Sequence, residues 1–284
     1  MSKVKMLRGL PGAGKSTVAK HLVTQDGNCG RVNRDSLREM LFNSQWSGKR
    51  EGIVVDCEKA IAEVLLRHNH TVLVDDTNLS AKHKDLWSGF ARNVGAAFET
   101  FDLGISVETA VERDAGRPNP VGKAIIHRMA LFNGLIQWPD KKIVIVDVDG
   151  TIACGKHREG HLEGERKDWK TYYSLLSDDG PIDIVIRWVR ELAKEYTICI
   201  VSGRPDTYQF ETIAWLDKHQ VPYDYIFMRP GNQKNPDTEI KKAVLDHLPK
   251  ERIEFVLDDR PSVVRMWKEN GLTVFPVRGQ IEEF

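Results

Sequence analysis

The sequence predicts two tandem α/β domains, each built on a parallel sheet. Apolar, strand-like runs alternate with helix-like stretches along the whole chain, which is typical of parallel sheets covered by helices. This alternation stops and restarts at residues 138–142, where Pro139 and charged residues break the periodicity. At 284 residues the chain is long enough for two cores, at about 100–200 residues per domain. We therefore expect domains over residues 1–138 and 139–284.

The elements of the first half follow one another at α/β spacing. Strands are expected over residues 3–7, in a run ending near Val32, and over 71–78 and 97–103. Helices are expected over residues 16–25, 56–69, 107–115 and 122–136. No internal repeat interrupts this order.

The second half repeats the pattern with four strands and the helices between them. Strands are expected over residues 143–150, 197–203, 225–228 and 253–259, and helices over 182–195 and 207–219. Residues 154–180 are polar, with many charges and few apolar positions. We expect this segment to cover a site.

Composition narrows the class of protein. The chain is 41% hydrophobic and 29% charged, and no run approaches the roughly 20 apolar residues of a membrane helix. The first residues have no signal-peptide pattern, so we expect a cytoplasmic protein without membrane partners. The four cysteines (Cys29, Cys57, Cys154 and Cys199) lack a Cys-x-x-Cys spacing and are expected to be reduced thiols.

Charge is balanced overall but unevenly distributed. The formal net charge is zero, which alone argues against a nucleic-acid binder. Residues 1–138 hold 19 Lys and Arg against 15 Asp and Glu, whereas residues 139–284 hold 22 against 26. This weak asymmetry suits an anionic substrate that approaches the first half.

The first half opens with GLPGAGKST, which satisfies the Walker A pattern in its usual context between an apolar run and a helix. Its glycines let backbone N–H groups turn toward phosphate oxygens; Lys15 can reach the β- and γ-phosphates, and the Ser16 hydroxyl can ligate Mg²⁺. An accidental glycine turn is the alternative. The expected ATP-binding residues here are Gly9, Gly12, Gly14, Lys15, Ser16 and Thr17.

Acidic and basic residues beyond this loop predict phosphoryl transfer. Asp35 could accept a proton from an incoming hydroxyl, and Arg38, one turn later, could hold an anionic group; a helix-capping Asp with a surface Arg is the alternative. Asp76, next to Asp75 at a strand end, is placed for Mg²⁺. Arg113 and Arg117, four apart on the expected helix, could close over the transferring phosphates.

The second half carries paired aspartates directly after a buried strand. With Mg²⁺ present, Asp147 can attack phosphorus to give an aspartyl-phosphate, and Asp149 can protonate the leaving oxygen and later activate water. Gly150 permits the tight turn, and Thr151 can donate to the phosphoryl group. These positions resemble the haloacid-dehalogenase-like phosphotransferase superfamily.

Three further motifs follow in the order of that superfamily. Ser202 is the expected phosphoryl donor, and Arg204 just beyond it is expected to bind substrate. Lys241 is the expected cation, with Lys242 as the alternative. Asp258 and Asp259 would complete the metal site with Asp147 and Asp149. Four motifs in order make chance an unattractive explanation.

Taken together, the motifs resemble the bacteriophage-type polynucleotide 5′-kinase/3′-phosphatase family over nearly the whole chain. The resemblance implies a P-loop NTPase-type kinase followed by a haloacid-dehalogenase-like Rossmannoid phosphatase. It implies that Asp35 is the kinase base and that Arg38 binds a 3′-phosphate. Thr77 would lie in the acceptor site, Arg113 and Arg117 would form a lid, and Asp237 would contact substrate. The family's arginine after the paired aspartates is Arg158 or Arg166, a choice that the spacing leaves open.

By the same resemblance, the protein phosphorylates 5′-hydroxyl ends with ATP and Mg²⁺ and removes 3′-phosphates or 2′,3′-cyclic phosphates. Its partners would be RNA or DNA ends and a ligase that acts afterwards, and the family also suggests a homo-oligomer. The cell would be a bacterial or phage-infected one. The alternatives are a fused small-molecule kinase and phosphatase, acting on sugars or nucleosides, and a nucleotide-sensing or scaffolding protein without turnover. The second alternative is disfavoured because Asp35, Asp147 and Asp149 are all present.

Overall fold

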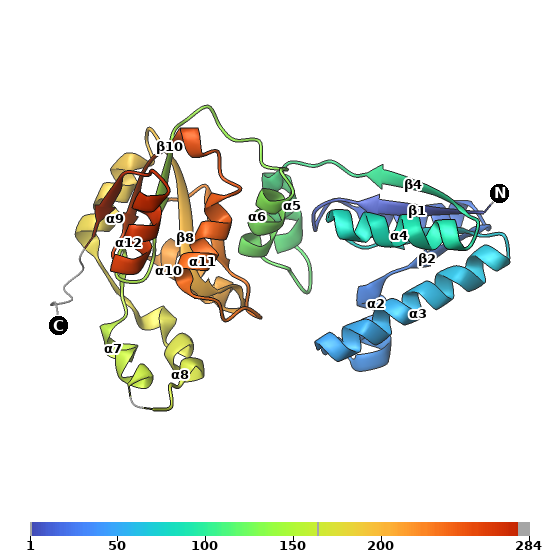
Figure 1. The fold of residues 1–284 in the computed structure, drawn as a ribbon, viewed down its shortest axis with the longest axis horizontal. Helices are drawn as coiled ribbons and strands as arrows, with labels where there is room; N and C mark the ends of the chain where they lie inside the picture. Colours follow the sequence, from blue (N-terminus) through green and yellow to red (C-terminus); the bar gives the residue numbers. More distant parts are fainter. Residues whose placement is uncertain (1, 164, 278–284) are drawn as a thin grey trace. The chain divides into compact units, whose positions relative to one another are not determined.

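The computed structural model describes residues 2–163 and 165–277, and divides the chain into two compact units, Met1–Pro120 and Val121–Phe284 (Figure 1). Both units are α/β, and every pairing within their two main sheets is parallel. The predicted fold class is confirmed. Among the described helices, none is long and apolar enough to cross a membrane.

The first unit is a four-stranded parallel sheet with the strand order β2-β3-β1-β4. Its strands are β1 (Lys3–Arg8), β2 (Cys29–Val32), β3 (Thr71–Asp75) and β4 (Ala97–Asp102). Its helices are α1 (Lys15–Gln25), α2 (Arg34–Phe42), α3 (Gly48–Arg67), α4 (Ala81–Asn93) and α5 (Val107–Ala115).

Alternating apolar side chains let helices cover both faces of this sheet. Val72 and Val74 of β3 pack into a core with Trp87 of α4, whereas the intervening Leu73 packs with Ala19 of α1. Successive side chains of a strand point to opposite faces, so this split follows directly from the sequence. The carboxyl ends of β1, β2 and β3 therefore meet at one edge, which is where polar residues follow each strand.

The second unit is a five-stranded parallel sheet with the order β11-β10-β5-β8-β9, and a separate antiparallel pair, β6-β7. The strands are β5 (Ile143–Val146), β6 (Ala153–Cys154), β7 (Gly180–Pro181), β8 (Thr197–Pro205), β9 (Tyr225–Arg229), β10 (Ile253–Asp258) and β11 (Val274–Pro276). The helices are α6 (Lys123–Phe132), α7 (Lys156–Glu159), α8 (Trp169–Ser174), α9 (Asp183–Leu192), α10 (Gln209–Lys218), α11 (Asp237–Leu245) and α12 (Pro261–Glu269), with short 3-10 turns at Gly160–Leu162, Leu176–Asp178, Asp206–Tyr208 and Lys250–Arg252.

The central strand of the second unit is β5, and all four of its residues are buried. Apolar side chains throughout this strand match a parallel sheet that is covered on both faces. The polar segment predicted over residues 154–180 forms α7 and α8, which lie at one end of the sheet (Figure 1).

Helix α6 is placed by the structure in the second unit, although the sequence boundary at residue 138 assigns it to the first. It packs against β9, where the backbone N–H of Ile226 donates to Nδ1 of the buried His127 at 3.0 Å. Gln209 Nε2 also donates to the Val121 carbonyl at 3.0 Å. The compact unit therefore begins before the predicted linker, because α6 contributes to its core. Residues 1–138 and 139–284 remain our proposal for where the two sequence domains meet.

Two helix ends also depart from the predicted elements. Helix α3 begins at Gly48, eight residues before the predicted start, with Ser47 accepting the Arg50 N–H at 3.3 Å as its N-cap. Helix α5 ends at Ala115 with Gly116 as its C-cap. Arg117 therefore lies beyond the helix, and the expectation that Arg113 and Arg117 share a helix face is wrong.

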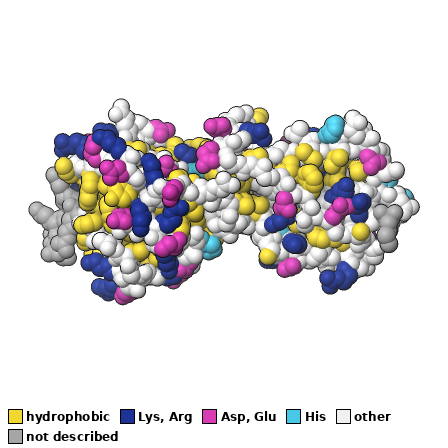
Figure 2. All heavy atoms as spheres, turned by 90° about the horizontal axis from the view of Figure 1, so that it is seen from above, with side chains coloured by type: hydrophobic (Ala, Val, Ile, Leu, Met, Phe, Trp, Pro, Cys, Tyr) yellow, Lys and Arg dark blue, Asp and Glu magenta, His cyan; other side chains and the backbone are white. Residues whose placement is uncertain are grey.

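Charges on the surface are mixed rather than gathered by sign. On the face shown in Figure 2, basic and acidic side chains are interspersed on both units. This distribution agrees with the formal net charge of zero.

Candidate active sites

The phosphate-binding loop of the first unit connects β1 to α1. Gly12 has φ 82°, and a Cβ there would lie 2.7 Å from the Ala110 carbonyl oxygen, so both conformation and space require glycine. Lys15 Nζ is buried and donates to the carbonyls of Gly9 (2.9 Å) and Leu10 (2.8 Å). Burial lowers the pKa of Lys15 to about 8. The lysine thus spans the loop, and a triphosphate would have to draw it away from these two carbonyls.

Two carboxylates follow β3 beside this loop. Asp75 is buried and is paired with Arg31 through Oδ2 at 2.6 Å, while its Oδ1 has no hydrogen-bond partner among the described residues. Burial raises the pKa of Asp75. Asp76, which we expected to serve the metal, accepts the backbone N–H of Arg34 through Oδ1 at 3.1 Å, and its Oδ2 is buried without a hydrogen-bond partner among the described residues. Asp76 therefore stays the predicted metal-binding carboxylate of this site.

The predicted base and its arginine lie together at the start of α2. Asn33 caps this helix by accepting the Ser36 N–H, so the capping role considered for Asp35 is taken by another residue. The Asp35 side chain is 82% exposed, and Arg38 Nη1 donates to it at 2.6 Å. Arg38 also donates from Nε and Nη2 to Glu51 at 3.0–3.1 Å. Glu51 lies 13 residues along the chain, and no spacing predicts this contact.

A buried ion pair joins the start of α2 to α3. Arg34 Nε donates to Glu58 at 2.8 Å and lies 3.5 Å from Asp76, and Glu58 is fully buried. Burial, and then the neighbouring Asp76 carboxylate, raise the pKa of Glu58 to about 8. Sequence reasoning missed Glu58. The sequence feature that could have revealed it is its position on α3: Glu58 lies at helical spacing between the apolar residues Val54, Ala62 and Leu66 that form the buried face of this helix.

The remaining kinase residues border the loop. Arg117 Nη1 donates to Asp114 at 3.0 Å and, by its charge, contributes to the lowered pKa of Lys15. Arg113 lies in the last turn of α5, and Thr17 in the first turn of α1. The Thr77 carbonyl accepts the Gly9 N–H at 3.2 Å. All of the predicted kinase residues thus belong to the segments around one loop of the first unit.

In the second unit, parallel strands bring three carboxylates together. Asp147 follows β5 and Asp258 ends β10, and ligand oxygens of Asp147, Asp258 and Asp259 lie within 4.8 Å of one another. Lys241 Nζ donates to Asp147 and to Asp258, each at 2.8 Å. Burial alone would lower the pKa of Lys241, but these carboxylates hold it well above its usual range. Lys241, and not Lys242, is therefore the buried cation.

This cluster fits a divalent cation. Burial raises the pKa of Asp147, and burial together with the neighbouring Asp258 raises the pKa of Asp259 to about 6. Clustered oxygen ligands of this kind suit a hard cation, which would relieve their mutual repulsion. Gly150, at φ 81°, allows the approach, since a Cβ there would overlap the Asp259 carboxylate.

Asp149 does not join that cluster. Arg204 donates to its carboxylate from Nε (3.0 Å) and Nη2 (2.8 Å), and Arg158 Nη2 donates to it at 2.5 Å. Burial alone would raise its pKa, but the two guanidinium groups hold the pKa of Asp149 well below its usual range. The arrangement thus favours an ionised Asp149, which is the protonation state of a general base rather than of a general acid. Its contacts are to arginines, so its expected place among the metal ligands stays a prediction.

Arg158 and Arg204 are fixed by a residue that sequence reasoning missed. Asp179, buried at 3% exposure, accepts Arg158 Nε at 2.7 Å and Arg204 Nη2 at 2.6 Å. Arg158 is fully buried and contacts Asp149, whereas Arg166 is exposed, so we propose Arg158 as the arginine that spacing left open. Arg204 was expected to contact substrate; its buried side chain contacts Asp149, and its substrate contact stays a prediction. In the sequence, the one sign of Asp179 is that it is the second of two consecutive aspartates before Gly180.

The other predicted phosphatase residues surround the aspartates. Ser202 is buried, and its Oγ accepts the Arg204 N–H at 3.2 Å. Thr151 Oγ1 is buried without a hydrogen-bond partner among the described residues, so it is available to a phosphoryl oxygen. Asp237 lies 3.6 Å from Lys241 Nζ and accepts Arg260 Nη1 at 3.2 Å. Its contacts are thus to cations of the site.

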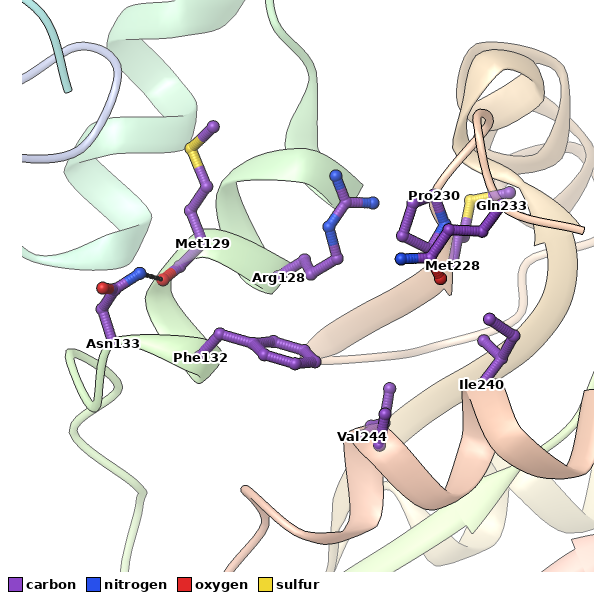
Figure 3. Close-up of a pocket in the computed structure, with 10 residues that line it drawn as sticks. Arg128, Met129, Phe132, Asn133, Met228, Pro230, Gln233, Ile240 and Val244 are labelled. Atoms are coloured by element: carbon purple, nitrogen blue, oxygen red, sulfur yellow. Dashed lines mark hydrogen bonds between the residues drawn. The ribbon is translucent and has the colours of Figure 1, made fainter. Parts of the chain in front are cut away.

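Two pockets adjoin the sheet of the second unit. One, of about 230 Å³, is lined by Asp149, Gly150, Arg158, Tyr172, Asp259 and Arg260, among others, and is the catalytic candidate. The other, of about 330 Å³, lies between α6 and α11 and is lined by residues such as Phe132, Met228 and Val244 (Figure 3). None of its lining residues belongs to the predicted catalytic set.

Comparison with known proteins assigns a type to each half. Residues 141–280 match the family described as the polynucleotide kinase PNKP phosphatase domain, and residues 4–132 match an AAA domain family. A putative bifunctional polynucleotide kinase/RNA ligase of Autographa californica nuclear polyhedrosis virus is 29% identical over 311 residues, covering 98% of this chain and 43% of that protein. The chain thus spans less than half the length of this curated relative.

Similar chains are also found among solved structures. A chain of the Pnkp1/Rnl/Hen1 complex is 26% identical, with 99% of this chain and 98% of that chain covered and a TM-score of 0.43. The HAD-hydrolase YfnB from Bacillus subtilis covers 51% of this chain and 90% of its own, at 14% identity and a TM-score of 0.39. The resemblance predicted from the motifs is confirmed by the family matches, and the two domain types imply use of a nucleotide and of a divalent metal ion.

Proposed function

From a P-loop domain joined to a PNKP-type phosphatase domain, we propose that this protein repairs the two ends of a broken RNA or DNA strand. It would transfer the ATP γ-phosphate to a 5′-hydroxyl and remove a 3′-phosphate. The observation that supports the proposal is that one chain carries two separate groups of the predicted catalytic residues, one in each unit. The products, a 5′-phosphate and a 3′-hydroxyl, are the ends that a polynucleotide ligase joins.

In the kinase site, an exposed carboxylate would act on the acceptor strand, and a buried lysine would bind the phosphates of ATP. The Asp35 carboxylate, exposed at the start of α2, takes the proton of the incoming 5′-hydroxyl as its oxygen attacks the γ-phosphorus and ADP leaves. Lys15 and Arg117, beside the loop, neutralise charge on the phosphates. Mg²⁺ at the Ser16 hydroxyl is our proposal for the metal. Arg38, beside Asp35, holds a phosphate of the acceptor strand.

In the phosphatase site, a carboxylate oxygen of Asp147 attacks phosphorus, and the bond to the 3′-oxygen breaks to give an aspartyl-phosphate and a 3′-hydroxyl. A divalent cation held by Asp147, Asp258 and Asp259, proposed to be Mg²⁺, supplies charge neutralisation. Lys241 orients Asp147 through its 2.8 Å hydrogen bond. Asp149, held ionised by its arginines, then takes a proton from the water that cleaves the aspartyl-phosphate.

The leaving 3′-oxygen needs a proton in the first step. Asp149 can carry it only when the arriving phosphate monoester, itself negatively charged, raises the pKa of that carboxyl. The same residue therefore serves as acid and then as base, and Arg158 and Arg204 set the balance between the two states.

A short RNA with a 5′-hydroxyl and a 3′-phosphate, incubated with ATP and Mg²⁺, tests the proposal. We expect the RNA to gain a 5′-phosphate and lose its 3′-phosphate, with gel mobility and end-specific radiolabels as readouts. Omission of ATP should stop only the first change. If neither end changed while ATP and a generic aryl phosphate were still consumed, polynucleotide would be the wrong substrate, and a small-molecule kinase and phosphatase would replace it.

A further inference from the structure

A row of aromatic side chains leads from the phosphatase pocket to the surface of the second unit. We call Trp169, Tyr172, Tyr173 and Tyr208 the aromatic row. Within it, ring centroids of Trp169 and Tyr173 are 5.8 Å apart at an interplanar angle of 24°, and those of Tyr173 and Tyr208 are 5.4 Å apart at 31°. Tyr172 meets Tyr173 edge-on at 5.2 Å. Three of its members come from α8, in the polar segment predicted to cover a site.

The inner end of the row contacts the catalytic groups. Tyr172 lines the 230 Å³ pocket together with Asp149. The Arg158 guanidinium carbon lies 4.1 Å from the centroid of the Tyr172 ring, and the same guanidinium donates to Asp149 at 2.5 Å. A strand whose terminal phosphate enters this pocket, beside Asp149 and Asp259, can therefore leave it past the Tyr172 ring.

The outer end of the row is exposed. Trp169 is 47% exposed on a helix of six residues, whereas Trp87, Trp215 and Trp267 are at most 2% exposed; Trp46 and Trp188 are also exposed but lie outside the row. A large aromatic side chain left half exposed forgoes part of the stabilisation that burial would supply. Lys167 lies over the Trp169 ring, 5.9 Å from its centroid, and Lys170 next to it is exposed. An aromatic surface with flanking cations matches how proteins hold single-stranded nucleic acid.

The row is also held in place. Arg229 Nη2 donates to the Tyr173 hydroxyl at 2.5 Å, and its guanidinium carbon lies 5.8 Å from the centroid of that ring. Arg229 Nε is buried without a hydrogen-bond partner among the described residues. Rings fixed before binding lose little conformational freedom when a base stacks on them.

We propose that the aromatic row stacks the unpaired bases at the 3′ end of a single strand whose terminal phosphate occupies the pocket. This inference rests on the proposed function and specifies its substrate: a single-stranded 3′-phosphate end, with little preference among bases, because every base has a π-face. A 3′-phosphate within a duplex is a poorer substrate, because its bases are already stacked and paired.

A double-mutant cycle between protein and substrate tests the proposal. One partner is Trp169→Ala; the other is an oligonucleotide whose last two nucleotides before the 3′-phosphate lack bases. For the wild-type protein we expect the abasic substrate to raise KM about tenfold, and for Trp169→Ala we expect both substrates to share that raised KM. Trp169→Phe, which keeps an aromatic face, should restore most of the difference. Trp188→Ala, which removes a 40%-exposed tryptophan on α9, is the matched control and should leave the difference unchanged.

Each outcome has one meaning. If wild type and Trp169→Ala discriminated equally against the abasic end, or if wild type did not discriminate at all, base stacking on the row would be refuted. A non-aromatic phosphate ester reports on catalysis alone, so a loss there would show that Trp169 supports the fold of α8 rather than a base. If no 3′-phosphorylated oligonucleotide were a substrate of the wild type while the small ester was, the proposed function itself would fail.

Discussion

The two phosphate sites of this chain differ in how far their charged groups are fixed before substrate arrives. In the first unit, Asp35 is 82% exposed, and Lys15 is hydrogen-bonded to carbonyls of its own loop. In the second unit, Asp147 and Lys241 are buried and already paired at 2.8 Å. We interpret this difference through the proposed reactions. A site that must admit both ATP and a strand end leaves its general base exposed, whereas a site that forms a covalent bond to its own carboxylate keeps that carboxylate buried and ion-paired. Mutations should therefore affect folding in the second site and binding in the first.

Removal of the buried cation should have the largest effect. Lys241→Met removes the ion-pair partner of the buried carboxylates Asp147 and Asp258, and should lower the free energy of unfolding by about 3–5 kcal/mol, with loss of phosphatase activity. Thermal unfolding and a 3′-phosphatase assay measure both effects. Lys242→Met, which removes the half-buried neighbour paired with Asp246, is the control and should change neither. Equal effects of the two variants would contradict the assignment of Lys241.

The next largest effect should distinguish Arg158 from Arg166 by phosphatase activity. Arg158→Lys breaks the contacts to Asp149 and Asp179, because an ammonium cannot reproduce them, and should cost about 10- to 100-fold in phosphatase kcat. Arg166→Lys, at an exposed position of the same segment, should cost nothing measurable. A substantial loss from Arg166→Lys would show that substrate, rather than Asp149, needs an arginine here.

A substitution in the first site should change substrate affinity rather than stability. Arg38→Ala should raise KM about tenfold for acceptors with a 3′-phosphate and much less for acceptors with a 3′-hydroxyl, because only the former use the guanidinium charge. Stability should change by less than about 0.5 kcal/mol, since Arg38 pairs with an exposed Asp35 and a part-exposed Glu51. Steady-state kinetics with matched oligonucleotides decide this. Equal losses on both acceptors would remove the role assigned to Arg38.

The last prediction concerns the pH dependence of stability. Burial lowers the pKa of His127 to about 3 from its ordinary 6.5, so the folded protein binds fewer protons than the unfolded chain between these values. Its contribution is complete above about pH 6.5 and is lost as pH falls, by up to about 1.4 kcal/mol per pH unit. In urea unfolding from pH 7 to pH 4, His127→Gln should therefore lose stability less steeply than wild type.

The exposed His247→Gln is the control for that series and should keep the slope of the wild type. If His127→Gln kept it as well, His127 would not be the group through which α6 is tied to β9. The membership of α6 in the second unit would then need another explanation.

Much of the fold could be predicted because it depends on local patterns. Apolar runs ending in aspartates predicted β3, β5 and β10, and parallel pairing then brought Asp147 and Asp258 to one edge. Contacts between distant segments could not be predicted in this way. Glu51 reaches Arg38 from another helix, and Asp179 reaches Arg158 and Arg204 from the polar segment. No period links such positions; only the folded chain brings them together.

The choice between neighbouring residues was also beyond the sequence. Asp75 and Asp76 differ by one position, and only the folded chain shows that Asp75 pairs with Arg31 whereas Asp76 accepts the Arg34 N–H. Arg117 was misplaced because Gly116 ends α5 before that residue. A glycine that ends a helix can be recognised in a sequence, but the spacing of the two arginines was taken as the stronger indication of a helix.

The central claim is that one chain holds two independent sites, one for each end of a break. The direct test follows both ends of one doubly labelled RNA in the presence of Asp35→Ala, Asp147→Ala, or an equal mixture of the two. We expect the first variant to remove only the 3′-phosphate, the second to phosphorylate only the 5′ end, and the mixture to do both. If either variant, still folded, lost both reactions, the two sites would depend on each other and the central claim would be wrong.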